Sequence, residues 1–228
     1  WSSDVCSSDL GMGSGIEAAV LASLTSGMAL ECVAGRIDAR SAGEIVMDAL
    51  PMDEKRKVSY CMFTLVDASL DGRASVIDHG NPAFILLRDG ECVPIEADCL
   101  RSERWGRREL KRWDFETRIG DRIVFFSDGV THSGLGDEGT PFGWGDEGVR
   151  DYATKLVEVE PGISARDLSR ALLAQALRND GGAACDDITC ATLYFREPRR
   201  LLVLTGPPFY EERDREFASR IQIGRAHV

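Results

Sequence analysis

The chain lacks a long apolar run, paired cysteines and an excess of positive charge. No apolar stretch in its 228 residues approaches the roughly 20 residues that a membrane-spanning helix needs. Its seven cysteines show no C-x-x-C spacing, which argues against a structural zinc site and favours buried thiols in a reducing cytosol. The formal net charge of −11 disfavours nucleic acid and anionic membranes, because an acidic surface repels both. We therefore expect a cytoplasmic protein with no nucleic-acid partner and no membrane segment.

Histidine is also scarce, with three residues, whereas aspartates stand at the ends of two apolar strand-like segments. The first segment, residues 123–126, is followed by Ser-Asp-Gly, in which Asp128 is the acid and Gly129 lets the chain turn after it. The second segment starts with Asp186 and Asp187. If the two strands are antiparallel neighbours, all three acids lie at one edge of a sheet. Such oxygen ligands hold Mg²⁺ or Mn²⁺, so the sequence indicates a metal-assisted enzyme.

Each acidic segment also has a plainer interpretation. Ser-Asp-Gly at residues 127–129 is a common turn sequence, and the Asp186-Asp187 pair is typical of a strand that follows a loop. Adjacent carboxylates repel one another unless a cation lies beside them. The two segments together therefore favour a metal site more strongly than either does alone.

Apolar periodicity predicts the helices and strands. Helices are expected over residues 16–34, 41–50 (with a capping box at Ser41 and Glu44), 147–157 and 165–178 (capped by Ser164). Strands are expected over residues 59–66, 74–79, 83–88, 91–95, 109–116, 122–127 and 187–195, with a hairpin turn at Asp89-Gly90. Antiparallel hairpins with helices before and after them predict an α+β fold with two layers of sheet covered by helices.

The two ends of the chain are related at the nucleotide level. An oligonucleotide that encodes residues 4–10 has a reverse complement that encodes residues 222–228. We therefore interpret residues 1–10 and 222–228 as translated sequencing adapter and the chain as a gene fragment that is incomplete at its N-terminus. Residues 11–196 are expected to form one partial domain, and residues 197–221 to begin a truncated C-terminal module.

Four segments of the chain, taken in order, match the motifs of one family. They are Gly11-Met12-Gly13-Ser14-Gly15, His79-Gly80-Asn81-Pro82-Ala83, the run from Gly120 to Thr131, and Asp186-Asp187-Ile188-Thr189. In this order they resemble the metal-dependent type 2C (PPM) protein phosphatases, and most closely their SpoIIE-like branch. The resemblance implies a four-layer α/β/β/α sandwich of two mainly antiparallel sheets flanked by helices, incomplete at the N-terminus.

The resemblance also implies roles for individual residues. Asp128 and Asp186 would be catalytic ligands of a first metal ion, and the backbone carbonyl of Gly11 would bind a second. Asp187 would lie just outside the ligands or order the loop. Two Mn²⁺ or Mg²⁺ ions would activate a water that hydrolyses phosphoserine or phosphothreonine. The usual substrate in this branch is a phosphorylated regulatory protein such as an anti-sigma-factor antagonist, and a membrane-anchored parent protein is compatible with the branch.

The chain departs from the family pattern at two positions. Leu10 stands where the family has an aspartate that bridges both ions, and an acidic ligand on an upstream strand is missing. We therefore expect this chain to bind metal poorly and to be inactive. His132 stands where many relatives carry an acidic residue, and a solvated loop histidine is favoured over a role near the metal. The glycine-rich loop over residues 134–148 is a candidate flap that faces the substrate.

Three other functions are compatible with parts of the sequence. A catalytically inert PPM-like domain that senses or binds a partner would keep the fold without the chemistry. A nucleotide-binding domain would use the Gly11–Gly15 loop, but the third spaced glycine and the βαβ alternation are missing. A phosphomonoesterase that acts on small molecules would share the metal site, since the protein substrate rests on the resemblance alone.

Overall fold

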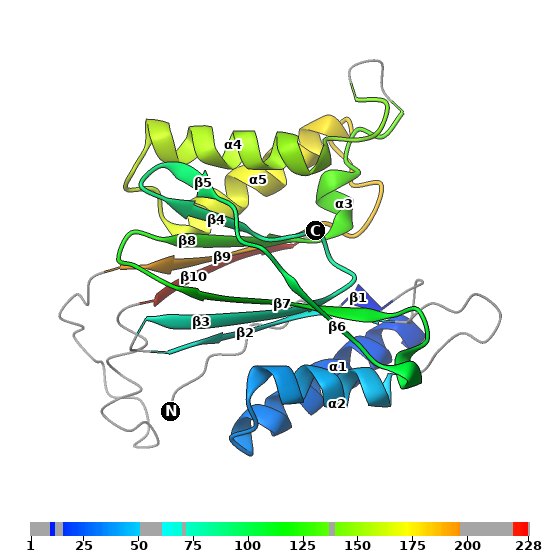
Figure 1. Cartoon of the computed structure of the whole chain (residues 1–228). Helices are drawn as coiled ribbons and strands as arrows, with labels where there is room; N and C mark the ends of the chain where they lie inside the picture. The colour runs from blue at the N-terminus through cyan, green and yellow to red at the C-terminus, as the bar shows by residue number, and fades with distance from the viewer. Residues whose placement is uncertain are drawn as a thin grey trace, which may run out of the picture. The chain divides into compact units, whose positions relative to one another are not determined.

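The computed structural model describes residues 10–11, 16–50, 61–69, 72–136, 140–196 and 221–227. The chain divides into two compact units, each with one sheet and its own helices (Figure 1). The first unit comprises residues 1–81 and 95–116, and the second comprises residues 82–94 and 117–228.

The first unit contains a five-stranded sheet in the order β1-β2-β3-β7-β6, with every neighbouring pair antiparallel. Its strands are β1 (Leu10–Gly11), β2 (Cys61–Ala68), β3 (Arg73–His79), β6 (Asp98–Arg101) and β7 (Glu109–Glu116). Its helices are α1 (Ile16–Ala34), α2 (Ala39–Ala49) and the short 3₁₀ helix η1 (Glu103–Trp105). Side chains from β2, β3 and β7 pack with α2 in one core that includes Phe63, Ile77, Leu110 and Met47.

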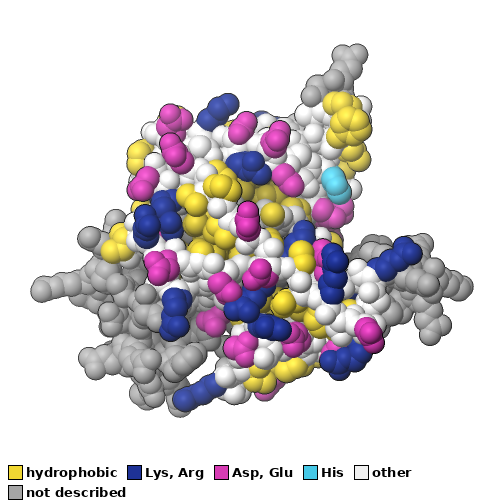
Figure 2. Space-filling model, in the orientation of Figure 1, with side chains coloured by type: hydrophobic (Ala, Val, Ile, Leu, Met, Phe, Trp, Pro, Cys, Tyr) yellow, Lys and Arg dark blue, Asp and Glu magenta, His cyan; other side chains and the backbone are white. Residues whose placement is uncertain are grey.

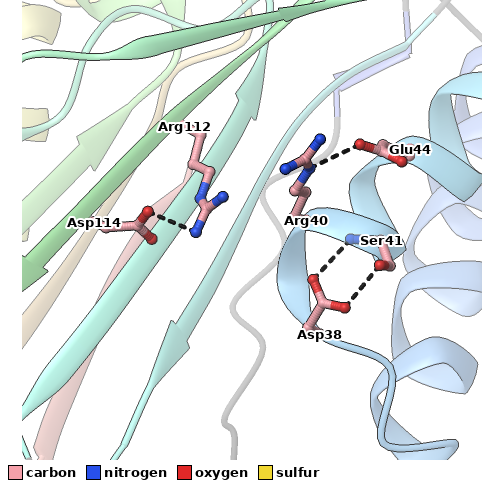
Figure 3. Close-up of polar contacts among 6 residues, drawn as sticks. All are labelled: Asp38, Arg40, Ser41, Glu44, Arg112 and Asp114. Atoms are coloured by element: carbon pink, nitrogen blue, oxygen red, sulfur yellow. Dashed lines mark hydrogen bonds and ion pairs between the residues drawn. The ribbon is translucent and has the colours of Figure 1, made fainter.

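Helix α2 begins two residues earlier than the sequence suggests. Its N-cap is Asp38, whose carboxylate accepts hydrogen bonds from the Ser41 N–H at 3.0 Å and the Ser41 hydroxyl at 2.7 Å (Figure 3). Ser41 is therefore the third helical residue and not the cap. Glu44 instead pairs with Arg40 at 2.9 Å, one turn away on the same helix face. The predicted capping box is wrong because an aspartate three residues upstream is an equally good cap.

The second unit contains the other five-stranded sheet, in the order β10-β9-β8-β4-β5, again with only antiparallel pairs among neighbours. Its strands are β4 (Ile85–Arg88), β5 (Glu91–Val93), β8 (Arg122–Phe126), β9 (Thr189–Phe195) and β10 (Ile221–His227). Its helices are α3 (Asp128–Thr131), α4 (Gly145–Val159) and α5 (Ala165–Asn179). Helices α4 and α5 lie over one face of this sheet (Figure 1), where Val149, Leu168 and Leu172 join Val124 and Phe126 in the core.

Two local predictions hold in the second unit. Ser164 caps α5, since its hydroxyl accepts the Asp167 N–H at 3.1 Å. Asp89 and Gly90 form the hairpin turn between β4 and β5, both with positive φ (52° and 85°). The expected α+β class, with two mainly antiparallel sheets flanked by helices, is confirmed.

Two predictions about the ends of the chain stay predictions. The expected C-terminal module falls mostly on residues 197–220, which lie outside the described residues. The backbone of residues 221–227 forms β10 beside β9, and this pairing leaves the adapter origin of residues 222–228 a prediction. None of the helices in the described part of the chain is long and apolar enough to span a membrane.

Candidate metal centre

The two acidic segments meet at one edge of the second sheet. Strands β8 and β9 are antiparallel neighbours, with Phe126 opposite Cys190 at the last paired position. Asp128 follows the end of β8 and Asp186 precedes the start of β9, so antiparallel pairing brings both acids to the same edge. The neighbouring, antiparallel arrangement expected from the sequence is confirmed.

Ser127 fastens the two segments together. This fully buried residue donates its backbone N–H to the Thr189 carbonyl oxygen at 3.0 Å. Its hydroxyl donates to the Asp187 carbonyl oxygen at 3.0 Å and accepts the Thr189 N–H at 3.0 Å. The hydroxyl therefore satisfies two backbone groups that the end of the β-ladder would leave unpaired. The start of β9 is fixed relative to the residue before Asp128.

Gly129 allows the close approach of the same two segments. A Cβ at this position would collide with the carbonyl oxygen of Asp187. Gly129 lies inside helix α3 and does not have a positive φ, so its backbone conformation does not require glycine. We expected this glycine to let the chain turn after the acid. That reason is wrong, although a glycine is required. The chain needs a residue without a side chain so that the backbone before β9 can lie against α3.

Helix α3 places a third potential ligand beside the two carboxylates. Asp128 is its first residue, and the His132 N–H donates to the Asp128 carbonyl oxygen at 2.8 Å. Residues four apart lie on the same helix face. One ligand atom each from Asp128, His132 and Asp186 lies within 4.8 Å of the other two. In the described part of the chain, no other group of three or more such side chains is brought together in this way.

Within the part of the chain that the structure describes, no basic side chain pairs with the carboxylates of this group. Among the described residues, neither Asp128 nor Asp186 forms an ion pair, and the one recorded hydrogen bond to these carboxylates comes from the Asp187 N–H to Asp186 at 2.8 Å. Asp128 is half-buried and Asp186 is exposed. Two unneutralised carboxylates this close repel one another, and a divalent cation removes that repulsion. Two carboxylates and an imidazole are a chemically suitable donor set for such an ion.

The other predicted site residues lie as follows. Asp187 has an exposed side chain, and its carbonyl oxygen is the group that Ser127 holds. Gly11 lies in β1 of the first unit, opposite Cys61, and its assignment to a second ion stays a prediction. His132 is exposed, in line with the expected solvated histidine, but its position beside the two acids was not expected because residues 128–131 were not predicted to be helical. The signal was the four-residue spacing from Asp128.

A pocket of about 560 Å³ adjoins the acidic group. One wall is formed by residues 132–135, including His132, and the other by residues 178–181 with Cys185 and Asp186. The Asp180 carboxylate bridges the two walls, since it accepts the Gly134 N–H at 2.7 Å and the Cys185 N–H at 3.1 Å. Each oxygen of this carboxylate therefore accepts a backbone N–H, and the two bonds join residue 134 to residues 180 and 185.

Arg178 adds a positive charge to this pocket. Its guanidinium donates to the Gln175 side-chain oxygen at 2.6 Å and to the Tyr152 hydroxyl at 3.4 Å, and both acceptors are neutral. Among the described residues it pairs with no carboxylate. On the face shown in Figure 2, the acidic and basic side chains of the described residues are interspersed and form no broad basic patch. Among the described residues that line the pocket, Arg178 is the one arginine or lysine.

Comparisons with known proteins agree with this fold. The family model of Stage II sporulation protein E (SpoIIE) matches residues 9–196. The solved phosphatase domain of SpoIIE from Bacillus subtilis, in a crystal form without domain swapping, has a TM-score of 0.55 and 14% identity, covering 84% of this chain and 91% of that one. The RsbU and RsbW domains of a Mycobacterium tuberculosis protein give a TM-score of 0.65 and 19% identity, covering 86% of this chain and 53% of that one.

A third solved structure, the catalytic domain of the serine/threonine phosphatase PstP in complex with two manganese ions, has a TM-score of 0.53 and 17% identity. The match covers 83% of this chain and 89% of that one. A search of curated proteins found no match. At these identities the structural likeness establishes the fold, whereas the family model spans most of the chain. The chain therefore belongs to the SpoIIE family and has the fold of the metal-dependent PP2C-type serine/threonine phosphatases.

Proposed function

We propose that this chain is the catalytic part of a metal-dependent phosphatase that removes phosphate from serine or threonine of a regulatory protein. The observation that carries the proposal is the approach of Asp128 and Asp186 within 4.8 Å, without a basic partner among the described residues, beside a pocket that contains Arg178. Carboxylates held this way have little structural purpose, since their mutual repulsion opposes folding. A divalent cation bound between the two carboxylates would remove this repulsion.

In such a hydrolysis, some residues of the chain would bind the ion and others would position its ligands. Asp128 and Asp186 would bind the cation through their carboxylate oxygens, and Ser127 keeps the second acid in place through the backbone before β9. When bound, a divalent ion lowers the pKa of a coordinated water and neutralises phosphoryl oxygens. The reaction consumes one water and releases inorganic phosphate and a free hydroxyl side chain. No nucleophilic side chain is needed.

The pocket supports a protein segment as the substrate. Its volume of about 560 Å³ is within the range that holds a ligand larger than phosphate alone. Arg178 would pair with an anionic group of that segment, either the phosphate or an acidic neighbour, because its present partners are neutral. Leu135 supplies an exposed apolar contact on the same pocket.

The identity of the regulatory protein rests on the relatives. The Mycobacterium tuberculosis structure joins an RsbU domain to an RsbW domain in one protein. This pairing supports a substrate in the same kind of regulatory system, and we propose a phosphorylated anti-sigma-factor antagonist. The glycine-rich loop that begins at Gly134 would face this substrate, since Gly134 and Leu135 line the pocket.

We also propose that the chain, as its sequence stands, has little activity. The family resemblance assigns a bridging aspartate to the position of Leu10, and leucine provides no ligand. Fewer oxygen ligands mean weaker binding of Mn²⁺ or Mg²⁺. The variant Leu10→Asp is therefore expected to bind Mn²⁺ more tightly than the parent chain and to hydrolyse a phosphoserine peptide faster.

The metal centre is tested by calorimetric titration of the full chain with MnCl₂. Asp128→Asn and Asp186→Asn are expected to abolish the binding heat, whereas Asp151→Asn, an exposed aspartate of α4 outside the group, leaves it unchanged. Retained Mn²⁺ binding in both site variants would overturn the proposal. The turnover of Leu10→Asp on the phosphopeptide then separates an enzyme from an inert binding domain, because only the enzyme releases phosphate.

The nucleotide-binding alternative has no specific support in the fold. Residues 12–15 of the glycine loop lie outside the described residues. Neither sheet has parallel pairs among its described strands, whereas a dinucleotide-binding fold is built on parallel βαβ units. Titration with ATP and NAD under the same conditions is expected to give no binding heat.

A further inference from the structure

We propose that His132 is a nitrogen ligand of the bound ion and that it makes the site prefer transition-metal ions over Mg²⁺. This inference rests on the proposed function, because it assumes that Asp128 and Asp186 hold a divalent cation. It goes further in naming a ligand that is neither an oxygen donor nor an acid. It also states which class of ion the site selects.

The position of His132 is set by the backbone on both sides of it. Its N–H is bonded to the Asp128 carbonyl oxygen at 2.8 Å, and its own carbonyl oxygen accepts the Leu135 N–H at 3.0 Å. Gly143 lies against the same backbone, since a Cβ there would come within 2.8 Å of the His132 Cα. The next residue, Ser133, accepts the Trp144 N–H at 2.9 Å. The Cα–Cβ bond of His132 therefore has a fixed direction relative to Asp128.

The imidazole is available for an ion. One of its ring nitrogens lies within 4.8 Å of a carboxylate oxygen of Asp128 and of Asp186. Among the described residues, no hydrogen bond or ion pair occupies the His132 ring, which is exposed on the wall of the pocket. Ligand atoms that share one ion 2.0–2.3 Å away are separated by roughly 3–4.5 Å, so small side-chain rotations bring all three into range.

The chemistry of the ring decides which ion benefits. Mg²⁺ is a hard cation that takes oxygen ligands and keeps several waters. Imidazole suits softer ions, and affinities for a nitrogen-containing site rise from Mn²⁺ to Co²⁺. A site with two carboxylates and an imidazole should therefore bind Co²⁺ most tightly, then Mn²⁺, and Mg²⁺ least. A site with three carboxylates would lose most of that difference.

A plainer role for His132 is as an exposed residue at the end of a short helix. A cationic ring there would interact favourably with the last carbonyls of α3, whatever ion is present. That role would not bring the ring nitrogen into contact with an ion. The two roles therefore differ in a spectroscopic signal and not only in affinity.

The test uses Mn²⁺ as the probe and pulsed electron paramagnetic resonance as the readout. The full chain loaded with Mn²⁺ is expected to show hyperfine coupling to one imidazole nitrogen. The coupling should disappear in His132→Asp, which puts a charged oxygen ligand in place of the ring, and in His132→Gln. A wild-type spectrum without nitrogen coupling, or a coupling that persists in both variants, would overturn the inference.

Calorimetry with MgCl₂, MnCl₂ and CoCl₂ provides the second measurement. The ratio of Co²⁺ to Mg²⁺ affinity is expected to fall about tenfold or more in His132→Asp. An unchanged ratio would contradict the inference about His132. The proposed function would still stand if Mn²⁺ binding depended on Asp128 and Asp186. Absence of Mn²⁺ binding in both the wild-type chain and Leu10→Asp would overturn both. Circular dichroism of each variant checks that the fold is retained.

Discussion

Two aspartates at opposite ends of strand β8 have opposite surroundings. Asp121, just before the strand, is only 1% exposed and accepts two hydrogen bonds from the Arg88 guanidinium, at 2.9 and 2.7 Å. It also accepts the Arg118 N–H at 2.8 Å. Asp128, just after the strand, is half-buried and has no basic partner among the described residues. One strand thus has a salt-bridged, buried acid at one end and, at the other, an acid that forms no ion pair among the described residues.

The two acids differ in whether a basic side chain pairs with the carboxylate. A buried carboxylate loses its hydration, and a bidentate arginine replaces it only if both partners are present. Asp121 therefore depends on Arg88 and leaves no free oxygen for an ion. Asp128 keeps its oxygens available near a second carboxylate, that of Asp186. The presence or absence of a basic partner, and not burial alone, separates the two.

The largest expected effect is on stability. Asp121→Ala removes the carboxylate that pairs with the partly buried Arg88 guanidinium, so the free energy of unfolding should fall by about 3–5 kcal/mol. Asp128→Ala, in the absence of metal, should change it by less than about 0.5 kcal/mol, since no partner is lost. Urea denaturation in buffer with a chelator measures both. Equal losses in the two variants would break the comparison.

Bound Mn²⁺ should make the stability of the folded chain depend on Asp128. At 100 times the dissociation constant, Mn²⁺ is expected to stabilise the wild-type chain by about 2.7 kcal/mol. Asp128→Asn should abolish this gain because a ligand is lost. The gain in an Asp151→Asn control, at an exposed position of α4, should equal that of the wild-type chain. Thermal unfolding with and without MnCl₂ measures the shift, and a full shift in Asp128→Asn would contradict the assignment.

Gly129→Ala tests whether close approach of the two segments is required. The added Cβ would overlap the Asp187 carbonyl oxygen, so a loss of about 1–3 kcal/mol in stability is expected, together with weaker Mn²⁺ binding. Gly27→Ala in α1 is the matched control, because nothing lies within 4 Å of its added Cβ. That variant should be stabilised by up to about 1 kcal/mol. Denaturation curves of the pair give the contrast directly.

A third aspartate sharpens the comparison through pH. Asp78 in β3 is 3% exposed, and its recorded hydrogen bond comes from the Thr64 hydroxyl at 2.5 Å. Burial raises its pKa to about 7, against smaller lowering effects from Thr64, Asn81 and Lys111. The folded state therefore binds this proton more tightly than the unfolded state, in which the pKa is near 3.8. Stability from this group is present below about pH 4 and is lost as pH rises towards 7.

Asp78→Asn should remove that dependence. Between pH 4.5 and 7, the difference in unfolding free energy between variant and wild type should change by at most about 1.4 kcal/mol per pH unit, in favour of the variant at higher pH. Urea denaturation at a series of pH values measures the difference. Parallel curves would show that Asp78 is neutralised in some other way, as Asp121 is by Arg88.

The sequence predicted the long, periodic elements and the shared edge of the two acids. Helix α1 and strand β7 lie at the expected residues, because each has a sustained apolar pattern. The four-residue helix α3 and the short, largely exposed strand β6 were not predicted, since neither is long enough to show a period. The family resemblance was correct because four motifs in a fixed order are more specific than any local pattern.

The finer features of the site could not be predicted because they depend on tertiary contacts. The Ser127 hydroxyl meets partners 60 and 62 residues away, and the contact of Gly129 with Asp187 spans a similar distance in sequence. No local pattern encodes such pairs. The position of His132 beside the acids required knowledge that a helical turn separates it from Asp128.

The brace formed by Asp180 separates the shape of the pocket from the chemistry of its lining. Because one carboxylate joins the backbones of Gly134 and Cys185, the opposing walls keep their spacing whichever side chains they display. Residues such as Leu135 can then be exchanged without displacing Asp186.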